Sequence, residues 1–229
     1  MNLESPLRTL ELDAMDVVMK KKAPAKPAKQ KLVYQFRVSL DESKPAIWRR
    51  IQLSEASTFW ELHVAIQDSM GWMDCHLHEF ELEQAKGGRL RIGVPSEEVE
   101  DDVQPGWKVS VADHLSRPGD TVSYLYDFGD DWRHTILLEG ILLEEAKVEY
   151  PVCLDGKRAC PPEDCGGVFG YENLLEALAD EDHPDHEELT EWMAENVESA
   201  KAFDPEAFNP AKIKFGNPAK RLKLATGGK

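Results

Sequence analysis

The sequence predicts an α+β fold with a β-grasp-like ββαβ start, a further antiparallel hairpin and C-terminal helices. Residues 32–40 alternate apolar and polar side chains, as a half-buried strand does. Residues 59–70 carry apolar side chains at helical spacing. Two strand-like segments, 121–127 and 134–141, flank a Gly-Asp turn. This order predicts one sheet with a helix across one of its faces.

Local signals mark the ends of the first elements. Residues 41–45 have turn composition and residues 47–53 resume an extended pattern, so the first two strands form a hairpin. Thr58 and Glu61 match a capping box, in which a hydroxyl and a carboxylate satisfy the first free N–H groups of a helix. Gly71 suits the C-terminal end of that helix.

The sequence signals for the later helices and strands are weaker. A third strand is predicted over about residues 76–83, whereas residues 86–120 are predicted to be irregular and the acidic run 97–102 to be a solvated loop. Two prolines and two glycines in 161–167 indicate a constrained loop. A short amphipathic helix follows, and Pro184 opens a second one. The apolar residues of these helices are Tyr171, Leu174, Leu175 and Leu178, then Leu189, Trp192 and Met193.

The charge of the chain divides it into three segments. The chain has 27 Lys+Arg and 43 Asp+Glu, a formal net charge of -16. Residues 1–31 carry +3, residues 32–200 carry -24 and residues 201–229 carry +5. We therefore expect a flexible basic N-terminal segment, an acidic domain and a basic C-terminal tail. The acidic body repels phosphate backbones, so nucleic acid is expected only through the tails. Solvated tails, and tails that fold back on the body, are the alternatives.

Several classes of protein are disfavoured by the sequence. No apolar run approaches the roughly 18 residues needed to cross a bilayer, and the N-terminus lacks the apolar core of a signal peptide. We therefore expect a soluble cytoplasmic protein without a membrane partner. Four cysteines in 229 residues are too few for a disulfide scaffold. The phosphate-loop, dinucleotide, Gly-x-Ser-x-Gly and His-Glu-x-x-His patterns are absent.

Three of the cysteines, Cys153, Cys160 and Cys165, lie close together in the sequence. Their separations of seven and five positions are wider than those typical of structural zinc ligands. Zinc is one interpretation, with His183 or His186 as a fourth ligand. Three reduced, inert thiols are the simpler interpretation, and a disulfide between Cys153 and Cys160 is a third.

Two histidines form another candidate site. In the predicted third strand, His76 and His78 share a face with the apolar Phe80. Imidazoles on an apolar face need partners, so a metal site that includes Cys75 or His63 is one interpretation. A pair of hydrogen-bonded histidines at the edge of the sheet is the other.

The predicted hairpin turn carries the third candidate site. Asp127, Asp130, Asp131 and His134 lie within eight residues, and together they could hold a divalent cation or act as acid and base. Arg133 could neutralise crowded carboxylates. Asp is also an ordinary turn residue, so a structural corner and a ligand pocket both remain open.

Four further segments occur in a characteristic order. They are Ile47-Trp48-Arg49-Arg50-Ile51; Met70-Gly71-Trp72 with His76-Leu77-His78-Glu79-Phe80; Tyr126-Asp127-Phe128-Gly129-Asp130-Asp131-Trp132-Arg133-His134; and Ala159-Cys160-Pro161-Pro162-Glu163-Asp164-Cys165-Gly166-Gly167. Together they resemble the plasmid pRiA4b ORF-3-like family over about residues 32–210. The resemblance implies a widespread, poorly characterised α+β domain, some of whose relatives are labelled transposon-associated and resolvase-like. Serine resolvases need a nucleophilic serine in an Arg-rich site, which the acidic body lacks.

Three functional hypotheses follow. The first is a non-enzymatic binding or adaptor module, with structural zinc as an option. The second is a metal-dependent, hydrolase-like enzyme that uses the Asp/His hairpin turn. The third and weaker one is a mobile-element-associated accessory protein whose basic tails bind nucleic acid. The sequence names no substrate, binding partner or oligomeric state.

Overall fold

A computed structural model describes residues 30–84, 87–95, 102–197 and 200–227 of the chain. The strands are β1 (Leu32–Leu40), β2 (Trp48–Ser54), β3 (His78–Glu83), β4 (Arg89–Gly93), β5 (Val103–Pro105), β6 (Thr121–Tyr126), β7 (Trp132–Leu143) and β8 (Val152–Lys157). The α-helices are α1 (Phe59–Met70), α2 (Gly167–Ala179), α3 (His186–Asn196) and α4 (Pro218–Ala225). Short 3-10 turns are η1 (Gly106–Lys108), η2 (Val111–Asp113), η3 (Ala200–Ala202) and η4 (Pro210–Lys212).

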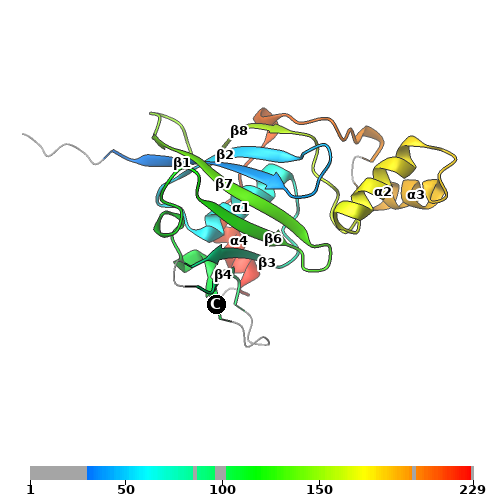
Figure 1. Ribbon diagram of the computed structural model, residues 1–229. Helices are drawn as coiled ribbons and strands as arrows, with labels where there is room; N and C mark the ends of the chain where they lie inside the picture. The colour runs from blue at the N-terminus through cyan, green and yellow to red at the C-terminus, as the bar shows by residue number, and fades with distance from the viewer. Residues whose placement is uncertain (1–29, 85–86, 96–101, 198–199, 228–229) are drawn as a thin grey trace, which may run out of the picture.

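The strands form one eight-stranded sheet in the order β5-β4-β3-β6-β7-β1-β2-β8. Neighbouring strands are antiparallel except for the parallel pair of β4 and β5. The predicted α+β class is confirmed, and the order β1, β2, α1, β3 is the predicted ββαβ start. In the sheet, β6 and β7 lie between β3 and β1. Figure 1 shows α2 and α3 side by side at one end of the molecule, beyond the sheet.

The first hairpin confirms the alternation read from the sequence. Strand β1 pairs with β2 in the register Phe36 to Ile51, and both of these side chains are buried. The polar side chains of the other face contact one another, because Arg50 and Gln35 both donate to Glu139 of β7. One face of the sheet therefore faces the core and the other faces water, as a period of two requires.

Helix α1 begins and ends where the sequence predicts. The hydroxyl of Thr58 accepts from the backbone N–H of Glu61, and the Glu61 carboxylate accepts from the backbone N–H of Thr58. Gly71 ends the helix with a left-handed φ of 100°. Arg49 of β2, which is buried, donates to the carbonyls of Ser69, Trp48 and Lys157, and so ties the end of α1 to the β2–β8 edge.

The prediction that residues 86–120 are irregular is wrong in part. Within this range β4 pairs with β3 and β5 pairs with β4. Strand β4 has only two inward apolar residues, Leu90 and Ile92, so its alternation is too short to stand out from a loop. The acidic run 97–102 lies outside the described residues except for Asp102.

The second hairpin is formed by β6 and β7, with Tyr126 opposite Trp132. The intervening residues 127–131 form the turn that carries the predicted acidic site. Strand β7 is two residues longer at each end than the pattern indicated, since it runs from Trp132 to Leu143. Both hairpins are therefore correctly predicted in kind and approximate in length.

The region after Pro151 contains elements that the sequence analysis missed, namely β8, α4 and the short turns η3 and η4. Residues 152–157 form the edge strand β8 against β2. Helix α2 is where its apolar residues predicted it, whereas α3 begins at His186, two residues after Pro184. Between Pro184 and α3, Asp185 is the cap residue.

The C-terminal segment returns to the sheet and to α1. Ala159 donates its N–H to the carbonyl of Pro205, and the guanidinium of Arg49 lies 4.0 Å from the ring centre of Phe208. The indole of Trp60 on α1 donates to the carbonyl of Pro218, the first residue of α4. Figure 1 shows α4 alongside α1. The C-terminal basic segment thus lies against the acidic body, with its ion pairs described below.

The core lies between α1 and the inward face of the sheet. Its largest fully buried side chains include Trp132, Tyr124, Tyr126, Phe36, Phe59 and Phe80. Within the described parts of the chain, no helix combines the length and the apolar character needed to cross a membrane.

Candidate metal site and adjoining pocket

The candidate site is built where three chain segments meet at one end of β3 and β6. Residue His78 pairs with Tyr126, so the residues just before β3 run beside the turn after β6. Asp127 donates its N–H to the carbonyl of Leu77, which fixes this approach. The third segment is the loop of residues 160–166, which we call the Cys loop.

The central group of the site is His76, Asp127 and Asp164, which we call the His/Asp triad. The Nε2 atom of His76 lies 3.0 Å from Oδ1 of Asp164 and 3.6 Å from Oδ2 of Asp127. This nitrogen is buried and has no hydrogen-bond partner among the described residues, although 28% of the His76 side chain is exposed. Two carboxylates therefore face one imidazole nitrogen without a hydrogen bond to hold them there.

The carboxylates of the triad are held by unusual backbone positions. Asp127 has a φ of 56° and Asp164 a φ of 60°, both in the left-handed region that non-glycine residues rarely adopt. The second carboxylate oxygen of Asp127 accepts from the N–H of Gly129, so its orientation is set within the turn. The left-handed backbone of Asp127 and its hydrogen bond to Gly129 together fix the direction of the Asp127 side chain.

A second group of donors adjoins the triad through His76. Cys75, His76 and Glu163 offer ligand atoms within 4.8 Å of one another, as do the three residues of the triad. The Glu163 carboxylate accepts from the hydroxyl of Tyr126 at 2.5 Å and from the N–H of Met73 at 2.8 Å. Burial, and then the hydrogen bond to Glu163, raise the pKa of Tyr126, so this phenol stays protonated and donates.

The Cys loop is fastened to the rest of the site by backbone contacts. The indole of Trp72 donates to the carbonyl of Pro161 at 3.0 Å, and the N–H of Gly166 donates to the Asp130 carboxylate at 3.2 Å. At Gly167, an added Cβ would lie 2.3 Å from the carbonyl oxygen of Asp130. The close approach of the loop to the hairpin turn therefore requires glycine at this position.

We expect Gly167→Ala to displace the Cys loop from the hairpin turn. The new methyl group meets backbone oxygen, and the φ of 71° adds strain, so stability should fall by about 1–3 kcal/mol. Gly119→Ala is a matched control, because Gly119 is also left-handed at 102° but has no atom within 4 Å of the added Cβ. Urea unfolding and the reactivity of the Cys165 thiol measure the effect. Equal losses in the two variants would show that the contact with Asp130 is not tight.

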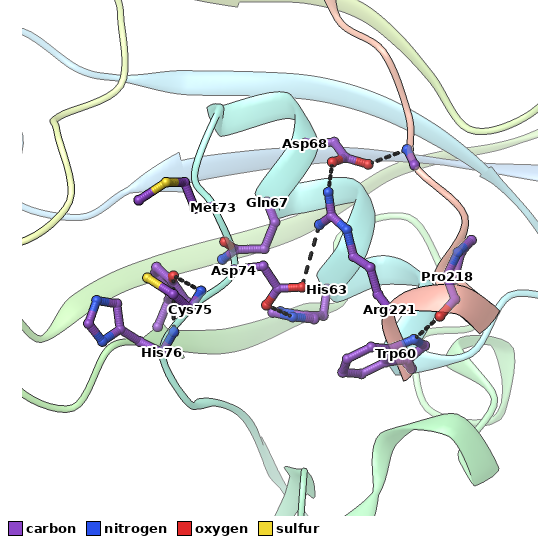
Figure 2. A network of polar contacts seen from close by, with 12 residues as sticks. Trp60, His63, Gln67, Asp68, Met73, Asp74, Cys75, His76, Pro218 and Arg221 are labelled. Atoms are coloured by element: carbon purple, nitrogen blue, oxygen red, sulfur yellow. Dashed lines mark hydrogen bonds and ion pairs between the residues drawn. The ribbon is translucent and has the colours of Figure 1, made fainter. Parts of the chain in front are cut away.

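A polar network joins α1, the residues before β3 and α4, and Figure 2 shows it from close by. The Arg221 guanidinium of α4 pairs with the carboxylates of Asp68 and Asp74. Asp74 in turn lies 2.8 Å from Nε2 of His63, whose Nδ1 lies 2.9 Å from the hydroxyl of Tyr124. Because Gln67 donates to Tyr124, the hydroxyl donates to His63, and His63 donates to Asp74.

The histidines in and beside this network are neutral. Burial, and then the charge of Arg221, lower the pKa of His63 to about 3. The ring of His78 stacks on that of His63 with 3.4 Å between ring centres, and burial holds the pKa of His78 well below its usual value. Two protonated rings at this separation would repel each other, so neutrality is what permits the stack.

A cavity of about 400 Å³ lies between this network and the triad. Its wall includes Trp60 of α1, Asp74 and His76 of the segment before β3, His78 of β3, and Arg221 of α4. The Nε2 atom of His78 is buried and has no hydrogen-bond partner among the described residues. The cavity is therefore lined by one ligand candidate, His76, and by His78 of the stacked pair.

The structure separates the two histidines that the sequence analysis placed on one strand face. Strand β3 starts at His78, so His76 lies before it, and the expectation of a shared face is wrong. The reason is local: Asp74 has a φ of 60°, and the N–H groups of Cys75 and His76 both donate to the Tyr126 hydroxyl. His76 joins the triad, whereas His78 stacks on His63.

The hairpin-turn candidates are also divided. Asp127 belongs to the triad, and Asp130 holds the Cys loop through Gly166. Asp131 is exposed and pairs with Arg133. His134 is buried in the core with Nδ1 3.0 Å from the carbonyl of Trp132, and burial lowers its pKa to about 4. His134 and Asp131 thus lie outside the triad, and the four residues do not form one cluster.

The three cysteines of the predicted zinc site are free thiols, so the disulfide interpretation is wrong. Neither of the two donor groups that gather within 4.8 Å in the described chain contains Cys153, Cys160 or Cys165. Burial raises the pKa of Cys165 to about 12 and raises that of Cys160 further, so both are protonated. Zinc at these three cysteines stays a prediction.

Sequence reasoning missed several residues of the site. Asp164 and Glu163 were read only as part of a tight loop, and Asp68, Asp74 and Arg221 were not singled out. Residues 76, 127 and 164 are too far apart in the sequence to form a recognisable metal-binding motif. The one usable signal was the crowding of Pro, Asp and Gly in the Cys loop, which is typical of a loop with a fixed conformation.

Comparisons with known proteins give a consistent result. The family model described as plasmid pRiA4b ORF-3-like protein matches residues 32–212. The uncharacterized protein y4hQ of Sinorhizobium fredii is 34% identical over 180 residues, which are 78% of this chain and 90% of y4hQ. A crystal structure of the protein of unknown function MM3350 from Methanosarcina mazei Go1 has 40% identity and a TM-score of 0.72. That likeness covers 81% of this chain and 99% of MM3350.

Proposed function

Because this chain belongs to the plasmid pRiA4b ORF-3-like family, whose two relatives described above are named without a function, we propose a function from the site itself. The chain is a binding module that holds a divalent metal ion with His76, Asp127 and Asp164. The observation that carries this proposal is the buried Nε2 atom of His76, which faces two carboxylates and has no hydrogen-bond partner in the part of the chain that the structure describes. A dication between these groups would neutralise both carboxylates.

The donor set favours zinc over magnesium. Imidazole nitrogen and carboxylate oxygen are both ordinary zinc ligands, whereas magnesium prefers oxygen and water in octahedral geometry. Cys75 and Glu163 lie within 4.8 Å of His76 and supply a further donor on the same side. Three segments that converge only in the folded chain would be joined by the ion, so binding should also stabilise the fold.

We expect purified, untagged full-length protein to retain about one zinc ion per chain after excess zinc is removed. His76→Gln and Asp164→Asn should each weaken zinc affinity by more than about 100-fold, beyond the effect of losing an outer partner. Asp131→Asn is the matched control, because Asp131 lies in the same hairpin turn but outside the triad. Elemental analysis and competition with a chelator measure stoichiometry and affinity.

The outcomes of this experiment distinguish the two metal hypotheses. Absence of stoichiometric zinc, or zinc binding that His76→Gln leaves unchanged, would contradict the triad. Loss of zinc in Cys165→Ser with full retention in His76→Gln would instead support the zinc site predicted at Cys153, Cys160 and Cys165.

A second candidate function is a metal-dependent hydrolase. Its support is the access to the triad: His76 lines the cavity, and the side chain of Asp164 is 65% exposed. If the ion is held by the three triad residues alone, without Cys75 or Glu163, a coordination position is left for water, which a zinc ion would acidify. Zinc-loaded protein should then hydrolyse p-nitrophenyl esters or phosphates, and Asp164→Asn should abolish the turnover. Turnover that persists in Asp164→Asn would count against this function.

The nucleic-acid hypothesis stays a prediction for both basic tails, and residues 1–29 of the N-terminal one lie outside the described chain. At the C-terminus, Arg221 faces Asp68 and Asp74 and is therefore engaged within the protein. Its charge is unavailable to a phosphate while these ion pairs persist.

A further inference from the structure

Helix α4 is attached to the body of the protein by polar contacts rather than by a buried apolar face. It is eight residues long, and none of its residues is buried. A cavity of about 400 Å³ lies between it and residues 73–78, and a hollow of about 680 Å³ lies beside it, lined in part by Trp107 and Leu222. A helix this short is marginal in isolation. Its position therefore depends on its polar contacts.

The start of α4 is fixed by hydrogen bonds to its backbone, and its middle by an ion-pair cluster, as Figure 2 shows. The N–H of Gly216 donates to the Asp68 carboxylate at 2.7 Å, and the indole of Trp60 donates to the carbonyl of Pro218 at 2.8 Å. Further along the helix, Arg221 places its guanidinium against Asp68. The guanidinium of Arg221 is thus the charged contact between α4 and α1.

The guanidinium of Arg221 pairs with two carboxylates that water hardly reaches. The side chains of Asp68 and Asp74 are 6% and 12% exposed, and a carboxylate this buried is unfavourable without a cation. Without the guanidinium, each would retain one neutral donor within the described chain, Gly216 for Asp68 and His63 for Asp74. Departure of α4 would then rehydrate both carboxylates, so loss of the guanidinium favours undocking of the helix.

Asp74 connects this ion-pair cluster to the proposed metal ligand, because it lies two residues before His76. Its φ of 60° is a left-handed conformation, which persists in a non-glycine residue only where the surroundings determine it. The backbone hydrogen bonds that follow are long, since the N–H groups of Cys75 and His76 share the Tyr126 hydroxyl at 3.2 and 3.4 Å. The ion pair of Asp74 with Arg221 is therefore a main constraint on the path of the chain into His76.

We propose that Arg221 is a positioning residue for His76 and that α4 is a latch, a helix that docks on α1 and undocks from it. With α4 docked, Arg221 holds Asp74, and Asp74 holds the segment that directs His76 into the His/Asp triad. When α4 undocks, this segment loses its constraint and zinc binds more weakly. The family match ends at residue 212, so the latch lies outside the matched region. The effect on zinc rests on the proposed metal function, whereas the latch itself does not.

Hydrogen exchange in the metal-free, full-length protein tests the latch without reference to zinc. In Arg221→Gln we expect the amides of residues 219–225 and of residues 73–77 to exchange faster than in the wild type by about tenfold. Amides of the β6–β7 hairpin should exchange at the wild-type rate, because the opening is local. Faster exchange in residues 219–225 alone would show that the helix does not position residues 73–77, and would overturn the proposal.

Two variants of the same helix separate positioning from the loss of a charge. Lys220→Gln removes an equal charge from the exposed neighbour of Arg221, and should leave exchange in residues 73–77 at the wild-type rate. Arg221→Lys keeps the charge but lacks the planar fork that reaches two carboxylates, so its exchange rates should lie between those of the wild type and Arg221→Gln. Equal acceleration in Lys220→Gln and Arg221→Gln would contradict the assignment to the ion pairs.

Competition with a chelator measures the consequence for zinc. We expect zinc affinity to fall by about tenfold in Arg221→Gln and by less in Arg221→Lys, with no change in Lys220→Gln. Unchanged or higher affinity in Arg221→Gln would refute the positioning role, because the guanidinium would then only repel the ion. If the wild-type protein binds no zinc, the metal proposal fails, while the exchange rates of residues 73–77 still decide whether the latch exists.

Discussion

Acidification from pH 7.5 to pH 5 is expected to lower the free energy of unfolding by about 2 kcal/mol for each of three buried histidines, His63, His78 and His134. Burial lowers the pKa of His63 to about 3 and of His134 to about 4, and holds that of His78 well below 6.5. Together these losses are a large part of the stability of a typical domain.

The sign of this effect follows from proton uptake. In the unfolded chain, each imidazole binds a proton as the pH falls through about 6.5, whereas the folded ring stays neutral to a lower pH. The unfolded state therefore binds more protons below pH 6.5, and stability decreases there. Burial raises the pKa of Asp74, and this carboxyl offsets part of the loss at the acidic end.

Urea unfolding between pH 7.5 and pH 5 measures the dependence. His134→Gln should reduce the fall in the free energy of unfolding between pH 7.5 and pH 5 by about a third, because one of the three buried imidazoles is gone. This holds whatever the stability of the variant at pH 7.5. His114→Gln, at an exposed histidine, should keep the wild-type dependence. An unchanged dependence in His134→Gln would refute the assignment of the effect to the buried histidines.

Trp72→Ala is expected to lower the free energy of unfolding by about 3–5 kcal/mol and to release the Cys loop. Trp72 is buried and stacks on Tyr126 with 5.0 Å between ring centres. Its indole also donates to the carbonyl of Pro161, which fastens the loop that carries Glu163 and Asp164. Truncation therefore removes core packing and one support of the metal site together.

Two further variants separate these contributions. Trp72→Phe keeps an aromatic ring and loses the hydrogen bond, so it should cost less, about 1 kcal/mol for that bond. Trp107→Ala removes a half-buried tryptophan from η1 and should leave zinc affinity unchanged. Urea unfolding and zinc competition are the measurements. Wild-type zinc affinity in a folded Trp72→Ala protein would show that the loop does not depend on this residue.

Elements whose signals are local were predictable from the sequence. The capping box of Thr58 and Glu61 is made within one turn of helix, so the start of α1 could be read directly. The β1–β2 hairpin depends on alternation over nine and seven residues, which is long enough to distinguish. Strands β4 and β8 are five and six residues long and owe their pairing to neighbouring strands, so the sequence did not reveal them.

The sequence predicted some residues of the site but not how they are arranged in space. The sequence pointed to His76 and Asp127 as candidates, and both belong to the triad. It grouped Asp127 with His134, although strand pairing sends His134 into the core and leaves Asp127 at the turn. A turn can be recognised within a few residues, but the direction of each side chain depends on the sheet register.

By itself, the sequence determined the α+β class, the two hairpins, helix α1 and the resemblance to the plasmid pRiA4b ORF-3-like family. Each of these depends on residues close together in the chain or on an ordered set of motifs. Only the tertiary structure brought His76, Asp127 and Asp164 together and placed Arg221 beside Asp74. Such contacts join residues 37 to 147 positions apart, and no local spacing specifies them, because they arise from strand order and from the packing of α4 on α1.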